Sequence, residues 1–354
     1  MDLNTLLNTA TQAGASDIYL ITGRPLSWKA GGAIVLADEK VMMPEDTKEL
    51  VEEIYRLAGG RDPQRVEKHG DDDFSFSLPG VARFRVSAYK QRGTLAAVIR
   101  VVAFSLPDPA DLGIPAIVID QAQQKKGLVL VTGPAGSGKS TTLSCMINQI
   151  NMTRNAHIIT LEDPIEFLHR HDKSIVSQRE IELDTDSYVV ALRASLRQAP
   201  DVILIGELRD SETMTIAMTA AETGHLVIST LHTVGAANTI DRIIDAFPAN
   251  QQGQIRVQLS MALKSVVSQQ LVPAAEGHKL LPVFEIMIVN DAIKNMIRES
   301  KIHQIDSVIT SSVAEGMCSM DASLLRLFNE GHITNTTAVA YATQPELMKK
   351  RLGR

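Results

Sequence analysis

Residues 127–140 read GLVLVTGPAGSGKS, and this stretch decides the fold of the chain. Its apolar first half predicts a buried strand over 127–132, and its second half fits the pattern G-x-x-x-x-G-K-S/T. A helix beginning at Thr141 is predicted to follow. In such a loop the glycines turn successive backbone N–H groups toward an anion, which the helix N-terminus also faces. The stretch therefore predicts a phosphate-binding loop in an α/β domain.

The loop is predicted to bind ATP and Mg²⁺ as cofactors. Lys139 is expected to reach the β- and γ-phosphates, and the hydroxyl of Ser140 is expected to hold the metal. The predicted nucleotide-binding residues are Gly133, Pro134, Ala135, Gly136, Ser137, Gly138, Lys139, Ser140 and Thr141.

Two further predicted strands end in carboxylates. The run DVILIGE (201–207) ends in Glu207, which is expected to face Mg²⁺, partly through water. The run LEDPIE (161–166) follows the apolar stretch HIIT (157–160) and contains Glu162. Because ligands of α/β proteins bind at the carboxyl ends of parallel strands, one of these acids would orient the attacking water.

Histidine and arginine side chains complete the candidate site. His232 ends the predicted strand 224–232, where it would sense the γ-phosphate or the metal. Phosphoryl transfer also needs cations on the developing charge, often from a neighbouring subunit. The candidate arginines are Arg83, Arg85, Arg92 and Arg100 in the first part of the chain and Arg193, Arg197 and Arg209 in the second.

The pattern around these motifs predicts two domains. Residues 1–103 form a small α+β domain with an antiparallel sheet, and residues 104–115, with three prolines, are the linker. Residues 116–354 form the ATPase domain, whose apolar strands alternate with helices and predict a mainly parallel sheet. From about residue 250 the pattern is mostly helical, with 280–289 as a possible late hairpin strand.

Composition narrows the classes of partner and compartment. The net charge is −6 and aromatic residues are 4% of the chain, so no nucleic-acid partner is expected. The 2 cysteines, far apart, exclude a four-cysteine zinc site and a disulfide framework. Neither a secretory signal nor a run of 18 apolar residues is present in the sequence, so a cytosolic protein is expected.

With these motifs the chain resembles the PilT-type ATPases, the retraction motors of type IV pili in the secretion-ATPase superfamily. TLEDPIEF (160–167) resembles the family's acidic "Asp box", GELRD (206–210) its atypical Walker B segment and STLHT (229–233) its "His box". DAIKNMIRES (291–300) is similar to the C-terminal motif tied to retraction. The further segments similar to the family are ASDIYLITGRPL (15–26), FSFSLPGVARFRVSAYKQRG (74–93) and SMDASLLRLFNEGHIT (319–334).

The chain departs from the family pattern at three positions. Tyr19 stands where a histidine is common, Lys294 where Arg is usual and Met296 where Leu is usual. Lys294 keeps the positive charge and loses the planar fork of Arg, so a bidentate contact would not form there.

The resemblance implies a hexameric ring in which each subunit has a PAS-like N-terminal domain and a RecA-like ATPase domain. Glu162 would be the catalytic carboxylate, with Glu207 as the alternative base, and His232 would belong to the site. First-domain arginines, with Arg83 and Arg100 preferred, would close over ATP at the domain interface. Hydrolysis would move an inner-membrane platform protein, drive pilus retraction and twitching motility, and place the ring at the inner face of the cytoplasmic membrane.

Several alternatives stay open at this point. Extension-type relatives are longer and usually carry a four-cysteine zinc motif, so the sequence favours retraction over pilus assembly. Secretion and DNA-uptake ATPases and the accessory retraction ATPase PilU share the same motifs, and a second retraction ATPase is a possible partner. A non-hydrolysing scaffold and a DNA-handling RecA-like ATPase are the rivals from other classes.

Overall fold

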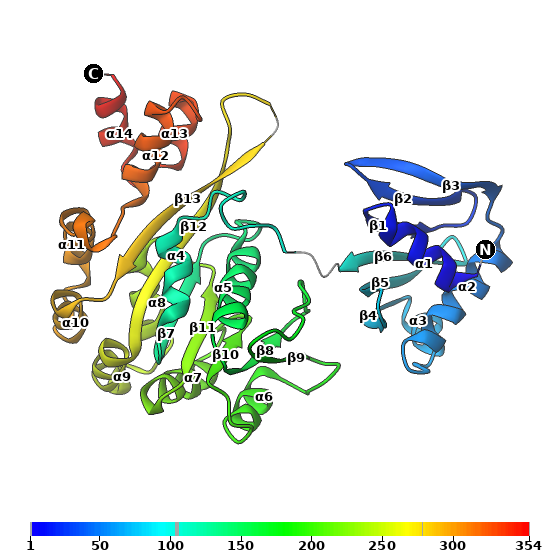
Figure 1. Ribbon diagram of the computed structural model, residues 1–354, viewed down its shortest axis with the longest axis horizontal. Helices are drawn as coiled ribbons and strands as arrows, with labels where there is room; N and C mark the ends of the chain where they lie inside the picture. The colour runs from blue at the N-terminus through cyan, green and yellow to red at the C-terminus, as the bar shows by residue number, and fades with distance from the viewer. Residues whose placement is uncertain (1, 103–105, 278, 354) are drawn as a thin grey trace. The chain divides into compact units, whose positions relative to one another are not determined.

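The computed structural model describes residues 2–102, 106–277 and 279–353, and these divide into two compact units. The first unit contains the elements α1 to β6, and the second contains α4 to α14 (Figure 1). Of the predicted linker 104–115, residues 104 and 105 lie outside the described part, and residues 106–115 form no helix or strand.

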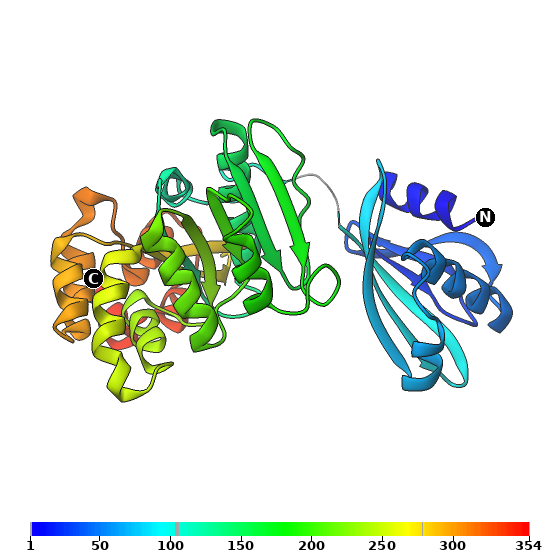
Figure 2. The same ribbon diagram turned by 90° about the horizontal axis from the view of Figure 1, so that it is seen from below.

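The first unit is built on an antiparallel sheet with the strand order β3-β2-β1-β6-β5-β4. Helices α1 and α2 pack together on one side of this sheet (Figure 2). The expected α+β unit is therefore confirmed, although β2 and α3 were not predicted. Its elements are α1 (Leu3–Gln12), β1 (Ala15–Leu20), β2 (Pro25–Ala30), β3 (Ala33–Val41), α2 (Pro44–Leu57), α3 (Gln64–His69), β4 (Asp71–Leu78), β5 (Ala82–Gln91) and β6 (Thr94–Val102).

The second unit is built on a seven-stranded sheet with the order β13-β12-β7-β11-β10-β8-β9. All neighbouring strands are parallel except the hairpin β12–β13. The strands are β7 (Gly127–Thr132), β8 (His157–Glu162), β9 (Ile175–Glu180), β10 (Val202–Ile205), β11 (Leu226–Leu231), β12 (Leu263–Pro273) and β13 (Leu280–Ile288). The helices are α4 (Ala116–Asp120), α5 (Lys139–Thr153), α6 (Tyr188–Ser195), α7 (Ser211–Thr223), α8 (Ala236–Asp245), α9 (Ala249–Ala262), α10 (Asp291–Arg298), α11 (Ile305–Ser311), α12 (Met320–Asn329), α13 (Asn335–Tyr341) and α14 (Pro345–Leu352).

Helices cover both faces of the central part of this sheet, which explains the apolar run of a strand such as β7. On β7, Leu128 and Leu130 join one core with α7 and α9, while Val129 and Val131 join the other with α5. A strand buried on both faces has no polar side, so its sequence shows an unbroken apolar run. The predicted mainly parallel α/β fold is confirmed.

Strand β12 corrects the prediction that the chain is mostly helical beyond residue 250. Its sequence LKSVVSQQLVP mixes apolar residues with two serines and two glutamines and shows no clear period of two. The strand forms because β7 pairs with it on one side and β13 on the other, in a register that runs from Ser265 opposite Ile288 to Pro273 opposite Leu280. Pairing of β12 with β7, which is distant in the sequence, therefore outweighs the weak strand preference of the residues in β12.

Candidate nucleotide site

The phosphate-binding loop joins β7 to α5 and is closed around its own lysine. Gly133, Gly136 and Gly138 have φ angles of 142°, 74° and 86°, in the region that favours glycine. The Nζ atom of Lys139 donates to the carbonyl oxygens of Gly133 at 2.8 Å and Pro134 at 2.9 Å. The lysine is thus held at the N-terminus of a 15-residue helix, where an anion is favoured.

Gln269 of β12 lies against both ends of this loop. A Cβ atom on Gly133 would lie 2.1 Å from the carbonyl oxygen of Gln269, and one on Gly138 would lie 2.8 Å from its Nε2. The Oε1 atom of Gln269 accepts a hydrogen bond of 2.7 Å from the hydroxyl of Thr142 on α5. Gln269 and Thr142 were not predicted as site residues; for Gln269 the local signal is a polar pair, residues 269–270, between apolar residues.

The loop fits a nucleotide with Mg²⁺. The hydroxyl of Ser137 is buried and has no hydrogen-bond partner among the described residues, so it is available to a phosphate oxygen. Ser140, in the first turn of α5, and Glu207, after β10, carry oxygen donors of the kind that Mg²⁺ prefers, and their binding of the metal stays a prediction. The nine predicted nucleotide-binding residues are contiguous in this loop and helix start, while their contacts with ATP remain a prediction.

Glu162 and Glu207 lie at the carboxyl ends of adjacent parallel strands. Leu161 of β8 pairs with Ile205 of β10, and the N–H of Gly206 donates to the carbonyl oxygen of Leu161 at 2.8 Å. The Oε1 atom of Glu162 accepts from Thr160 Oγ1 at 2.6 Å and from Gln178 Nε2 at 3.2 Å. Both carboxylates are therefore at the same edge of the sheet as the phosphate-binding loop.

Glu207 is the centre of a three-residue polar cluster with Arg209 and His232. Its Oε1 lies 2.5 Å from Nη2 of Arg209, and its Oε2 lies 3.3 Å from Nε2 of His232. The hydrogen bond from Arg209 lowers the pKa of Glu207 against the opposing effect of partial burial. The structure thus brings together three predicted candidates, His232, Glu207 and Arg209.

The hydroxyl of Tyr188 lies beside Gly206, the residue before Glu207, and Tyr188 was not predicted as a site residue. A Cβ atom on Gly206 would lie 2.6 Å from the hydroxyl oxygen of Tyr188. Burial raises the pKa of this tyrosine, and the negative charges of Asp163 and Glu207 raise it further. Tyr188 therefore remains a neutral phenol that limits the space at the strand ends.

The arginines predicted to meet the nucleotide lie on strands of the first unit. Arg83 on β5 is 9% exposed and donates to the hydroxyl of Ser77 at 3.3 Å. Arg100 on β6 is 64% exposed, and its Nε lies 3.0 Å from Oδ1 of Asp17. Their catalytic role stays a prediction. Of the second-unit candidates, Arg209 contacts Glu207, whereas Arg193 pairs with Glu212.

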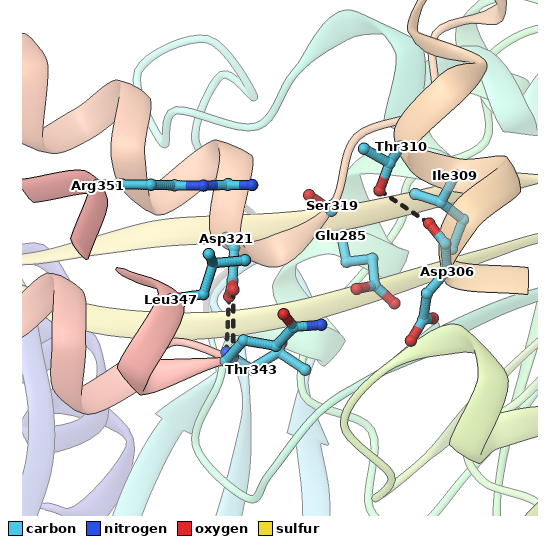
Figure 3. A pocket seen from close by; sticks show the side chains of 10 residues that line it. Glu285, Asp306, Ile309, Thr310, Ser319, Asp321, Thr343, Leu347 and Arg351 are labelled. Atoms are coloured by element: carbon cyan, nitrogen blue, oxygen red, sulfur yellow. Dashed lines mark hydrogen bonds between the residues drawn. The ribbon is translucent and has the colours of Figure 1, made fainter. Parts of the chain in front are cut away.

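A second cavity lies between the β12–β13 hairpin and the C-terminal helices (Figure 3). Glu285 of β13, Asp306 of α11 and Asp321 of α12 line it, together with Arg351 of α14. Burial raises the pKa of both Glu285 and Asp306. Glu285 accepts from the N–H of Ala236 at 2.7 Å, so this carboxylate holds the start of α8 to the hairpin.

The chain is similar to known pilus motors over nearly its whole length. It is 42% identical to the type IV pilus retraction ATPase PilT of Pseudomonas aeruginosa, over 98% of this chain and 99% of that protein. It is 40% identical to the type IV pilus ATPase PilU of the same organism, over 97% of this chain and 89% of that protein. The crystal structure of the pilus retraction motor PilT with bound ADP superposes with a TM-score of 0.89, at 43% identity and 99% coverage of both chains.

A family model described as "Type II/IV secretion system protein" matches residues 1–298. Among the described residues, no helix has the length and apolar character needed to cross a membrane. With the phosphate-binding loop, the strand-end carboxylates and a match over nearly the whole chain, the protein belongs to the type II/IV secretion system protein family and is a PilT-like ATPase.

Proposed function

We propose that this protein is a homohexameric motor that hydrolyses ATP to drive type IV pilus retraction, and through it twitching motility. The observation that carries the proposal is the likeness over 98% of the chain to a retraction ATPase. The placement of Lys139, Glu162 and Glu207 at one edge of one sheet supports it, because phosphoryl transfer needs charge stabilisation and an oriented nucleophile together.

The proposed reaction is an in-line attack of water on the γ-phosphorus of ATP. Glu162, fixed by Thr160 and Gln178, orients the water and accepts its proton as the new P–O bond forms. The bond between the γ-phosphorus and the bridging oxygen breaks, and ADP leaves with that electron pair. Lys139, with Arg83 and Arg100, neutralises the developing negative charge. Ser140 and, through water, Glu207 would hold Mg²⁺, which would supply further charge neutralisation when bound.

The role of Glu162 is tested against a neighbouring carboxylate. In saturating ATP, Glu162→Gln is expected to lower steady-state phosphate release about 100-fold or more, because the base is lost while the side-chain shape is kept. Glu166→Gln is the matched control, since Glu166 is exposed in the same segment. Near wild-type turnover of Glu162→Gln would assign the base to Glu207 instead.

The ring is proposed to act on an inner-membrane platform protein at the inner face of the cytoplasmic membrane. Closure of the two units over ATP would depend on the γ-phosphate, and hydrolysis would release it, so that the motion passes to the platform. A second retraction ATPase would share the work in cells that have one. No nucleic-acid partner is proposed, because the chain is acidic and poor in aromatic residues.

The retraction function is tested in the source cell by replacing the native protein with Lys139→Ala. Abundant surface pili with lost surface motility are expected, because filaments would form and could not be withdrawn. Lys125→Ala, an exposed lysine of the same unit, is the control and should leave both unchanged. Bald cells would indicate an assembly motor, and unchanged pili and motility would indicate secretion or DNA transport.

An accessory PilU-like role is the second candidate, because identity to PilU, at 40%, is nearly that to PilT, at 42%. Deletion of the gene separates the two. Deletion of a main motor is expected by itself to abolish retraction. Deletion of an accessory motor would leave retraction working against low load.

A further inference from the structure

Gln269 stands at the point where β12 reaches the phosphate-binding loop. The parallel pairing of β12 with β7 ends at Ser268 opposite Thr132, so Gln269 is the next residue and faces Gly133. Its carbonyl oxygen occupies the space that a side chain at Gly133 would need. Gln269 is 3% exposed, so both its backbone and its amide lie within the protein.

The side-chain amide of Gln269 spans the other end of the loop. Its Oε1 accepts from Oγ1 of Thr142, which is fully buried on α5, at 2.7 Å. Its Nε2 lies where a side chain at Gly138 would be. One residue of β12 therefore contacts the first glycine of the loop, its last glycine and the first turn of the helix that follows.

The hairpin that carries Gln269 also contacts the segment after His232 and the C-terminal helices. Ser268 Oγ accepts from the N–H of Gly235, three residues after His232, at 2.9 Å. Gln269 pairs with Phe284 of β13, whose carbonyl oxygen accepts from Ser323 Oγ of α12 at 2.6 Å. A shift of the phosphate-binding loop would therefore displace β12, and through it β13 and α12, because hydrogen bonds connect each of these elements to the next.

We propose that Gln269 is a positioning residue that fixes the phosphate-binding loop in its nucleotide-binding shape and links that loop to the β12–β13 hairpin and α12. It acts through Gly133, Gly138 and Thr142 rather than on the nucleotide. This inference rests on the proposed nucleotide site. A loop already held in the bound shape loses less conformational entropy on binding, so nucleotide affinity depends on the amide.

The test compares Gln269→Ala with Gln270→Ala in the purified full-length protein. Gln270 has the same chemistry at the next position and is half-buried on the opposite face of β12. Binding of a fluorescent ADP analogue is expected to weaken about tenfold in Gln269→Ala, because Thr142 loses its buried acceptor, and to change less than about twofold in Gln270→Ala. Melting without nucleotide is recorded for both variants.

Three further variants separate positioning from packing: Gln269→Glu, Thr142→Val, and Thr142→Val combined with Gln269→Ala. Gln269→Glu keeps the acceptor for Thr142 and brings a negative charge beside the phosphate loop, so it is expected to weaken ADP binding more than Gln269→Ala does. Thr142→Val combined with Gln269→Ala is expected to bind ADP no more weakly than the worse single variant, because the two residues act through one hydrogen bond.

The outcomes distinguish failure of the proposed function from failure of the positioning role of Gln269. If the wild-type protein bound no ADP analogue and released no phosphate from ATP, the proposed function itself would be wrong. If the wild type bound and Gln269→Ala bound equally well, or lost affinity only in proportion to a lowered melting temperature, the positioning role would be wrong. Additive losses in the double variant would also overturn it, because they would show that Thr142 and Gln269 act separately.

Discussion

His232 and Glu207 are joined across two strands: Nε2 of His232 lies 3.3 Å from Oε2 of Glu207. His232 follows β11 and Glu207 follows β10, and these neighbouring strands pair in parallel register up to Ile205 opposite Ser229. The carboxylate is 16% exposed and also meets Arg209. The position of the carboxylate is therefore set by the ends of two paired strands and by contacts with Arg209 and His232.

Glu207→Gln is expected to lower ATP turnover at least about 100-fold while ADP binding stays within about threefold of wild type, because the variant removes the charge and keeps the shape. Steady-state phosphate release and binding of a fluorescent ADP analogue provide the two measurements. Glu212→Gln is the control, since that carboxylate is 55% exposed and pairs with Arg193. A Glu207→Gln variant with wild-type turnover would place Glu207 outside the reaction.

Gly206→Ala is expected to destabilise the second unit by about 1–3 kcal/mol, because its Cβ would lie 2.6 Å from the hydroxyl of Tyr188. The backbone at Gly206 does not require glycine, so the clash is the cause. Adding Tyr188→Phe removes that oxygen and should restore most of the loss, measured by calorimetry. If the double variant is as unstable as Gly206→Ala alone, the clash is with other atoms.

Asp72→Asn is expected to destabilise the first unit by about 3 kcal/mol, because it leaves the charge of Arg61 without its buried partner. Arg61 Nη2 and Nε lie 2.7 and 2.9 Å from the two carboxylate oxygens of Asp72, and Tyr55 donates to the same group at 3.0 Å. Trp28, the one tryptophan of the chain, is buried in this unit, so its fluorescence during urea unfolding gives the measurement.

The neighbouring, exposed Asp71 supplies the control for that prediction. Asp71→Asn should leave the urea midpoint reported by Trp28 within experimental scatter. Equal shifts for Asp71→Asn and Asp72→Asn would mean that net charge, rather than the Arg61–Asp72 pair, sets the stability of this unit.

Glu285→Gln and Glu207→Gln are expected to change the pH dependence of stability in opposite directions. Burial raises the pKa of Glu285, so its stabilising contribution is complete below about pH 4.5 and is lost as the pH rises through its folded-state pKa. The hydrogen bond from Arg209 lowers the pKa of Glu207, so its contribution is present above about pH 4.5 and is lost as the pH falls through its folded-state pKa.

Thermal unfolding at a series of pH values measures this difference. Relative to wild type, Glu285→Gln should gain stability as the pH rises above about 4.5. Glu207→Gln should lose stability, relative to wild type, as the pH rises from acid values toward about 4.5. Glu285 lines the cavity in Figure 3 beside Asp306, whose pKa burial also raises, so Asp306→Asn is expected to behave like Glu285→Gln. Parallel curves for all three variants would contradict the assignment of these environments.

Much of the second unit could be predicted from local pattern. The runs before Gly133, Glu162 and Glu207 are mainly apolar strands, and each is followed by a residue that departs from that pattern. The start of helix α2 (Pro44–Leu57) is also marked locally, because Pro44 and two acidic residues lie in its first turn. Strands β2 and β12 were missed because their sequences mix polar and apolar residues and form through pairing with neighbours.

By itself, the sequence determined the phosphate-binding loop, the strand-end carboxylates and the α/β class, because glycines, apolar runs and caps act over a few residues. Only the tertiary structure decided which of these residues meet. Thr142 and Gln269 are separated by 127 positions and share a buried hydrogen bond. Tyr188 reaches Gly206, and Arg209 and His232 reach Glu207, because sheet order and helix packing bring them there. Such contacts depend on the register of distant strands, which no local stretch of sequence carries.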